Sequence, residues 1–118
     1  MNQNAEIVAD TIEEQPITKV IFRFWDGEVI ALFPEDPSDV QNWYNCSSYM
    51  HIGQHSGADS QHIINSSRPA TPEEYASLKK ELESYPYNYR FEIRQRISPE
   101  MRETRKREWQ RLQDLLKA

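Results

Sequence analysis

Arginines in the last third of the chain are the residues best suited to chemistry. The stretch after Ser98 carries an apolar stripe at helical spacing that includes one arginine: Met101, Arg105, Trp109, Leu112 and Leu116. A guanidinium offers rigid, bidentate donors to phosphate oxygens, so Arg105 with Arg102 or Lys106 could hold phosphates. The alternative is structural: Arg105 lays its stem along the apolar surface, with its head turned outward or stacked on Trp109.

Arg107 and Arg111 share a second face of the same helix, four residues apart. Glu103 and Glu108 lie nearby, so this surface carries a weaker positive potential than its arginines alone would give. The sequence therefore indicates several possible phosphate contacts, and which of these arginines bind a phosphate stays open.

One cysteine and three histidines fall close together in a polar segment. Cys46, His51, His55 and His62 are residue types that bind zinc, with the spacing C-x4-H-x3-H-x6-H. This spacing fits no zinc pattern with a clear mechanism, and histidines scattered in a polar segment are usually solvated or hydrogen-bonded. We therefore expect no metal site and no cofactor.

The patterns of common nucleophilic and nucleotide-hydrolysing enzymes are absent from the sequence. Ser47, Ser48 and Ser56 lie near the histidines, but no nucleophile-elbow glycine pattern surrounds them. With three glycines in 118 residues, neither glycine-rich phosphate-binding consensus is present. We expect a binding protein with no catalytic residues.

A β-hairpin is the firmest local prediction. Residues 1–16 carry four acids and no base, which is typical of a disordered acidic tail, and we assign 17–118 to a single domain. β-Branched and aromatic residues dominate 17–25, and a second apolar run covers 28–34. Between these runs stands Asp26-Gly27, the pair that type I′ hairpin turns favour.

The middle of the chain predicts one strand, one long loop and one helix. Residues 47–52 form a candidate third strand, and the polar residues 53–68 predict a loop that is either functional or disordered. Thr71 then supplies a helix cap, Pro72 suits the first helical position, and Glu74 completes a capping box.

The last third predicts a strand and a long helix. Aromatic or aliphatic residues alternate with polar and basic ones over 87–97, as in a strand with one buried face. Ser98 and Pro99 repeat the cap signal before a helix that runs to about 117. The predicted fold class is α+β: a small antiparallel sheet built on an N-terminal hairpin, with one mid-chain helix and one long C-terminal helix.

Charge is distributed unevenly along the chain. Residues 1–89 hold 5 basic and 14 acidic residues, whereas 90–118 hold 9 basic and 5 acidic residues. The net charge of −5 opposes sequence-independent attraction to nucleic acid, so a nucleic-acid partner is the least favoured class. The single cysteine, and the lack of a signal peptide or a membrane-spanning apolar run, favour a cytoplasmic protein without a membrane role.

The chain resembles small proteins of phages and mobile elements in four places. These are the stretches ITKVIFRFWDGEVIALFP, SYMHIGQH and RPATPEEYASLKKELES, and the arginine-rich helix after SPEM. Within that set, the hairpin, the polar segment and the basic terminal helix are similar to the Thoeris anti-defence family. The resemblance covers residues 17–112. It implies an oligomeric sponge in the host bacterial cytosol that sequesters a cyclic ADP-ribose isomer, or a cyclic oligonucleotide, without cleaving it.

Such a ligand needs donors for its phosphates and a stacking surface for its base. The candidate contacts are Arg102, Arg105, Arg107, Tyr75, Asn88 and Tyr89. Apolar residues near the end of the terminal helix, including Leu112 and Leu116, suggest a homo-oligomer. The alternative is a protein-binding inhibitor of a host defence complex, such as an anti-CRISPR, which would ignore small nucleotides.

Overall fold

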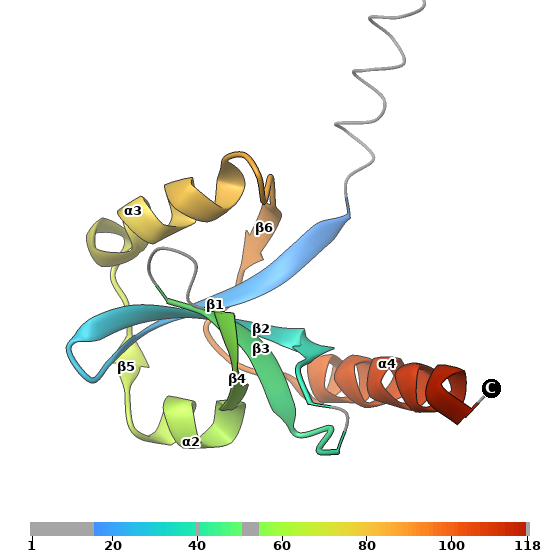
Figure 1. The fold of residues 1–118 in the computed structure, drawn as a ribbon. Coiled ribbons are helices and arrows are strands. Elements are labelled where there is room, and N and C mark those ends of the chain that lie inside the picture. Colours follow the sequence, from blue (N-terminus) through green and yellow to red (C-terminus); the bar gives the residue numbers. More distant parts are fainter. Residues whose placement is uncertain (1–15, 40, 51–54, 118) are drawn as a thin grey trace, which may run out of the picture.

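An α+β fold built on one six-stranded sheet is seen in the computed structural model, which describes residues 16–39, 41–50 and 55–117 (Figure 1). The strands are β1 (Ile17–Trp25), β2 (Glu28–Pro37), β3 (Asn45–Tyr49), β4 (His55–Asp59), β5 (Arg68–Pro69) and β6 (Arg90–Ile93). The helices within these ranges are α2 (Ser60–Asn65), α3 (Pro72–Glu83) and α4 (Pro99–Lys117). Strand order is β4-β3-β2-β1-β5, and β6 also pairs with β1.

The predicted hairpin is confirmed. Asp26 and Gly27 join β1 to β2 with φ values of 51° and 80°, the two positive angles that a type I′ turn requires. Phe24 pairs with Val29 in the antiparallel register that follows from this two-residue turn. The second strand continues to Pro37, beyond the predicted end at residue 34.

Alternate residues of the hairpin build two separate cores, one on each face of the sheet. One core contains Val20, Phe22, Ala31, Phe33 and Tyr49, with Leu78 and Leu82 of α3 packed against them. The opposite core contains Ile21, Ile30, Leu32 and Cys46, covered by Ile63 of α2. Figure 1 shows α3 and α2 on opposite sides of the sheet, so the central hairpin is buried from both sides.

Helix α3 begins where its sequence predicts. The Thr71 hydroxyl accepts from the Glu74 N–H, and the Glu74 carboxylate accepts from the Thr71 N–H, which confirms the capping box. The same carboxylate binds Arg68 at 2.6 and 2.7 Å, and the Arg68 guanidinium lies over the Phe24 ring. The cap therefore also fixes α3 to the hairpin.

The predicted polar loop over 53–68 is wrong for the described residues 55–68, which form β4, α2 and the start of β5. Asp59 caps α2 by accepting from the His62 N–H at 3.2 Å, and Ile63 is buried against the sheet. The polar composition of this segment gave no sign of its secondary structure, because a helix as short as α2 needs only one buried apolar side chain to pack against the sheet. The third strand spans 45–49 rather than 47–52, and residues 51–54 lie outside the described residues.

The strand predicted over 87–97 is shorter, and it pairs in parallel with β1 rather than extending an antiparallel sheet. Its N-terminal part is held by α3 instead, because the Tyr89 N–H donates to the Leu82 carbonyl and Asn88 adopts a positive φ of 55°. Four residues remain to form β6, and Ile93, which was expected on the buried face, is 38% exposed.

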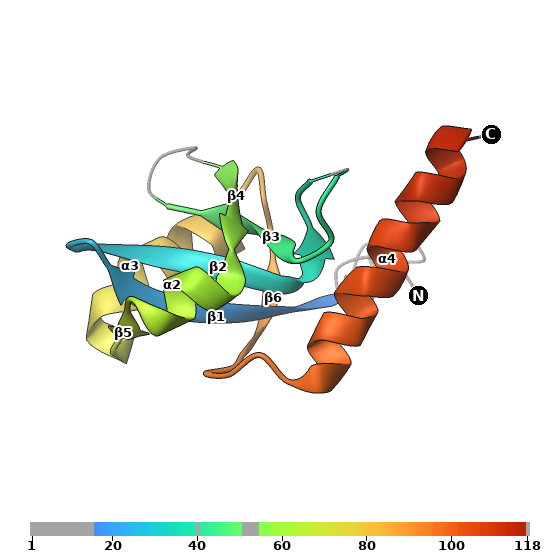
Figure 2. The same cartoon turned by 90° about the horizontal axis from the view of Figure 1, so that it is seen from below.

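Helix α4 matches the predicted start at Pro99, with Ser98 accepting from the Met101 N–H. Its first half packs on β2, and its C-terminal end extends away from the sheet (Figure 2). Met101 and Arg105 are buried, whereas Leu115 and Leu116 are exposed. The apolar stripe is thus covered only at its beginning.

The arginine in that stripe points into the protein. Arg105 is 2% exposed, and its Nε donates to the Trp43 carbonyl while Nη1 donates to the Pro34 carbonyl, both at 3.0 Å. Nη1 also lies 3.3 Å from the Ser60 hydroxyl oxygen. Three orientations were considered from the sequence: outward, stacked on Trp109 or facing a phosphate. The structure instead directs this guanidinium to two backbone carbonyls and the Ser60 hydroxyl.

Replacing Arg105 with alanine is expected to lower the free energy of unfolding by about 3 kcal/mol, because two buried carbonyls lose their charged donor and the side chain leaves a void. Urea denaturation followed by tryptophan fluorescence measures this change. The matched control is Arg107→Ala, an exposed arginine on the same helix, for which we expect a change within about 0.5 kcal/mol. Equal stabilities for the two variants would contradict the clamp role of Arg105.

Candidate functional site

The three arginines predicted from the sequence lie in three different environments. Arg105 is enclosed as described above, and burial lowers the pKa of its guanidinium. Arg102 is exposed on the first turns of α4 and donates to the Gln61 side-chain oxygen at 2.9 Å. Arg107 is exposed on another face of α4, with Thr104 as its neighbour at 3.4 Å. They do not form one phosphate site.

The three remaining predicted residues are also separated. Tyr75 is half-buried on α3, where its ring stacks on Phe22 with a centroid distance of 4.5 Å. Asn88 is exposed in the turn before β6. Tyr89 is half-buried and stacks on Phe33, with ring centroids 5.3 Å apart. Of these three, only Tyr89 lines a hollow that continues toward α4.

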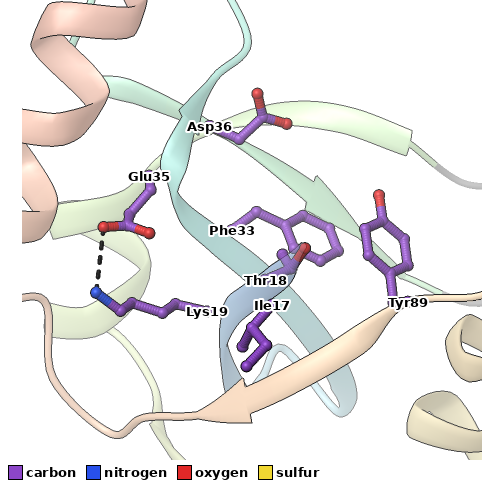
Figure 3. A pocket seen from close by; sticks show the side chains of 7 residues that line it. All are labelled: Ile17, Thr18, Lys19, Phe33, Glu35, Asp36 and Tyr89. Carbon is purple, nitrogen blue, oxygen red and sulfur yellow. Dashed lines mark hydrogen bonds and ion pairs between the residues drawn. The ribbon is translucent and has the colours of Figure 1, made fainter. Parts of the chain in front are cut away.

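That hollow, the aromatic pocket, has a volume of about 220 Å³. It is lined by Ile17, Thr18, Lys19, Phe33, Glu35, Asp36 and Tyr89 (Figure 3). Lys19 and Glu35 pair at 3.3 Å on one side, Tyr89 stands on the other, and Phe33 lies between them (Figure 3). Strand β1, the end of β2 and the segment before β6 thus combine to form an aromatic wall with a polar rim.

A second hollow, the α4 groove, adjoins the aromatic pocket. It is lined by Pro16, Glu35, Asp36, Thr104, Arg107, Glu108 and Arg111, and it has a volume of about 790 Å³. Both hollows are lined by Glu35 and Asp36, so they adjoin at the end of β2, with Tyr89 in one and Arg107 in the other. The structure therefore places these two of the six predicted residues in adjoining hollows.

Most charges along this surface are already neutralised. Lys19 binds Glu35, and Arg111 binds Glu108 at 2.5 Å. In the described part of the chain, Asp36 and Arg107 form no ion pair. One carboxylate and one guanidinium thus remain available for a ligand.

The pKa values of two lining residues are shifted. Removal of water raises the pKa of Asp36, a hydrogen bond from Ser47 opposes this, and the charge of Glu108 adds to the rise. Burial also raises the pKa of Tyr89, and the nearby Asp36 and Tyr87 contribute. The Tyr89 hydroxyl therefore stays protonated at neutral pH and can donate a hydrogen bond.

Sequence reasoning missed the two acids that connect the hollows. Glu35 and Asp36 lie at the end of β2, beyond the apolar run over 28–34, and nothing local marks them as site residues. The i, i+4 spacing of Arg107 and Arg111 did indicate a shared face, and both residues line the α4 groove. The aromatic wall requires Phe33 and Tyr89, which are 56 positions apart in sequence and meet only in the fold.

Within the ranges that the structure describes, the cysteine and histidines considered as zinc ligands do not come together as a metal site. Cys46 is fully buried, His62 is exposed on α2, His51 lies outside the described residues, and nothing is described of the His55 side chain. Among the described residues, no group of three or more histidine, cysteine or acidic side chains is placed to hold a metal ion.

The fold and its adjoining hollows define a small α+β protein with a groove between the sheet and the C-terminal helix. No protein family model, curated protein sequence or solved structure matches the chain. No helix in the described ranges has the length and apolar character needed to cross a membrane.

The thiol of Cys46 is expected to be unreactive in the folded protein. Burial raises its pKa to about 11, although the charge of Arg105 acts in the opposite direction. At pH 8 roughly one thiol in a thousand is then ionised, and the thiolate is the reactive species. Alkylation by iodoacetamide, followed by mass spectrometry, should be at least about 100-fold slower in buffer than in denaturant. Similar rates in both conditions would contradict the burial.

Proposed function

We propose that the chain binds a nucleotide-type ligand across the aromatic pocket and the α4 groove and holds it without chemical conversion. The observation that carries this proposal is that Tyr89 and Arg107 line two hollows that adjoin at Asp36. An aromatic ring, an acceptor and a cation are the groups that a base, its polar substituents and a phosphate require.

The aromatic pocket suits the base. Tyr89 stacks on Phe33 and on Phe91, so its ring is held in place before a ligand arrives. Stacking of a base on such a ring contributes about 1–3 kcal/mol. At the rim, the Asp36 carboxylate can accept hydrogen bonds from an exocyclic amino group or a ribose hydroxyl.

The α4 groove suits the phosphates. Arg107 and the Thr104 hydroxyl offer hydrogen-bond donors from one face of α4, and Arg111 adds a guanidinium held by Glu108. A guanidinium without an acidic partner contributes more binding free energy with a phosphate than a paired guanidinium does, because no existing ion pair has to break. Arg107 is therefore the principal phosphate contact in this proposal.

Binding without cleavage is supported by the residue types at the surface. The described side chains that line the two hollows include no serine, cysteine or histidine. Their hydroxyl groups belong to Thr18, Thr104 and Tyr89, so the usual pairing of a nucleophile with a histidine base is not built there. The ligand should leave the site unchanged.

The class of ligand in this proposal is taken from the resemblance to the Thoeris anti-defence family. We propose a cyclic ADP-ribose isomer, or a cyclic oligonucleotide, sequestered in the host bacterial cytosol by a phage or mobile-element protein. Such ligands combine a base with phosphate groups, and the two adjoining hollows offer an aromatic ring and a guanidinium for these two parts.

Self-association through α4 is part of the same proposal. Leu115 and Leu116 are 59% and 67% exposed at the projecting end of the helix. A second copy suits this surface because the basic region 90–118 complements the acidic region 1–89 of its partner. Leu116→Glu is expected to lower the mass in solution from dimer or higher to monomer, as measured by analytical ultracentrifugation. A monomeric wild-type chain at all concentrations would contradict self-association.

Isothermal titration with cyclic ADP-ribose isomers and cyclic oligonucleotides tests the binding proposal. We expect tight binding of one class, with the ligand recovered intact by heat release and chromatography. Arg107→Ala should weaken that binding about 10- to 100-fold, because a charged hydrogen bond to phosphate contributes about 1.5–3 kcal/mol.

The matched control is Lys106→Ala, which removes the same charge from the next position of α4. The Lys106 ammonium lies over Trp43 and does not line the groove, so its loss should leave the affinity within about twofold. An equal loss in both variants would point to a general charge effect. No heat with any nucleotide would reject the proposal and favour the alternative, an inhibitor that binds a protein of a host defence complex.

A further inference from the structure

A third hollow, the basic cleft, lies apart from the proposed nucleotide site. It is lined by Arg23, Gln61, Ile64, Pro69, Gln95, Arg96, Ile97 and Arg102, and its volume is about 360 Å³. Arg23 lies on the sheet face of Ile21, whereas Phe33 of the aromatic pocket belongs to the core on the other face. The two hollows share no lining residue.

Charge distinguishes the basic cleft from its surroundings. Three of its lining residues are arginines, and no acidic side chain lines it among the residues that the structure describes. The chain as a whole carries −5, so this positive potential is a local feature. A concave surface of one charge concentrates counterions, in this case anions.

Arg23 gives the cleft a fixed positive wall. It is 7% exposed and donates to the Ser67 hydroxyl at 2.8 Å and to the carbonyls of Ser67 and Ile64 at 2.7 and 3.1 Å. All of these acceptors are neutral, and burial lowers the pKa of the guanidinium. A buried charge without a counterion is costly, and an anion bound in the cleft would offset part of that cost.

Arg96 and Arg102 supply the exposed donors. Arg102 is oriented by its bond to Gln61, whose amide in turn donates to Asn65 at 2.9 Å. Arg96 is exposed and forms no ion pair within the described ranges. Two guanidinium groups from different segments can therefore face the same ligand, with Ile64 and Ile97 as apolar surface beside them.

We propose that the basic cleft is a phosphate-binding site for a small phosphorylated molecule. A phosphate monoester carries about −1.5 to −2 charge and three acceptor oxygens, which match the converging guanidinium groups. A cleft of this volume falls in the range of small-ligand sites, and the net charge of the chain opposes wrapping by a nucleic-acid backbone. This site is independent of the nucleotide proposed for the α4 groove.

NMR titration of the ¹⁵N-labelled full chain with inorganic phosphate and pyrophosphate, at constant ionic strength, tests the site. We expect saturable shifts of the Arg96 and Arg102 side-chain N–H signals, with tighter binding of pyrophosphate. Arg96→Ala and Arg102→Ala should each weaken binding about tenfold. Both residues are exposed, so dispersed spectra of the variants should confirm that each one is folded.

Two controls make the outcome decisive. Arg94→Ala removes an exposed arginine that pairs with Glu92 and does not line the cleft, so the affinity should remain within about twofold. The second control is the choice of signal: the shifts are read at the Arg96 and Arg102 side chains, which line the basic cleft and not the α4 groove. The proposal is overturned if chloride gives the same shifts, if Arg94→Ala weakens binding as much as Arg96→Ala, or if only long oligonucleotides bind.

Discussion

The burial of one guanidinium, that of Arg105, connects the sheet to the C-terminal helix. Its N–H groups donate to the Pro34 carbonyl in β2, the Trp43 carbonyl before β3 and the Ser60 hydroxyl at the start of α2. One side chain thus joins four segments that are far apart in sequence. Such a charge is tolerated because its hydrogen bonds replace those lost to water. Two of the hollows lie between segments that this contact holds together: the α4 groove is bounded by α4 and β2, and the basic cleft by α4 and α2.

The central hairpin determines where the hollows open. Because alternate residues of β1 and β2 face opposite sides, the aromatic core beneath α3 and the aliphatic core beneath α2 are separated by the sheet. The rings of Phe33 and Tyr89 extend from the first core to the aromatic pocket. Arg23 lies on the other face and forms a wall of the basic cleft. An acidic chain can therefore present a mixed-charge groove and a positive cleft on separate surfaces.

Local signals in the sequence predicted local structure well and the candidate site in part. The turn at Asp26, the cap at Thr71 and the start of α4 depend on neighbouring residues, so composition and spacing were sufficient. Tyr89 and Arg107 were predicted as ligand contacts, but the hollows that they line adjoin at Asp36, which no motif marks. Arg105 was predicted as a ligand contact from its position on the helix alone. Helical periodicity shows which face a residue occupies, but not which segment of the protein packs against that face.

By itself, then, the sequence determined the α+β class, the hairpin, the mid-chain helix, the long C-terminal helix and the concentration of basic residues after residue 89. These features follow from interactions within a few residues: turn angles, capping hydrogen bonds and hydrophobic periodicity. Only the tertiary structure decided that β6 pairs in parallel with β1, that residues 55–69 add strands and a short helix, and that each predicted arginine has a different environment. These outcomes depend on contacts between distant segments, where burial and the pairing of each charge are fixed by the whole fold.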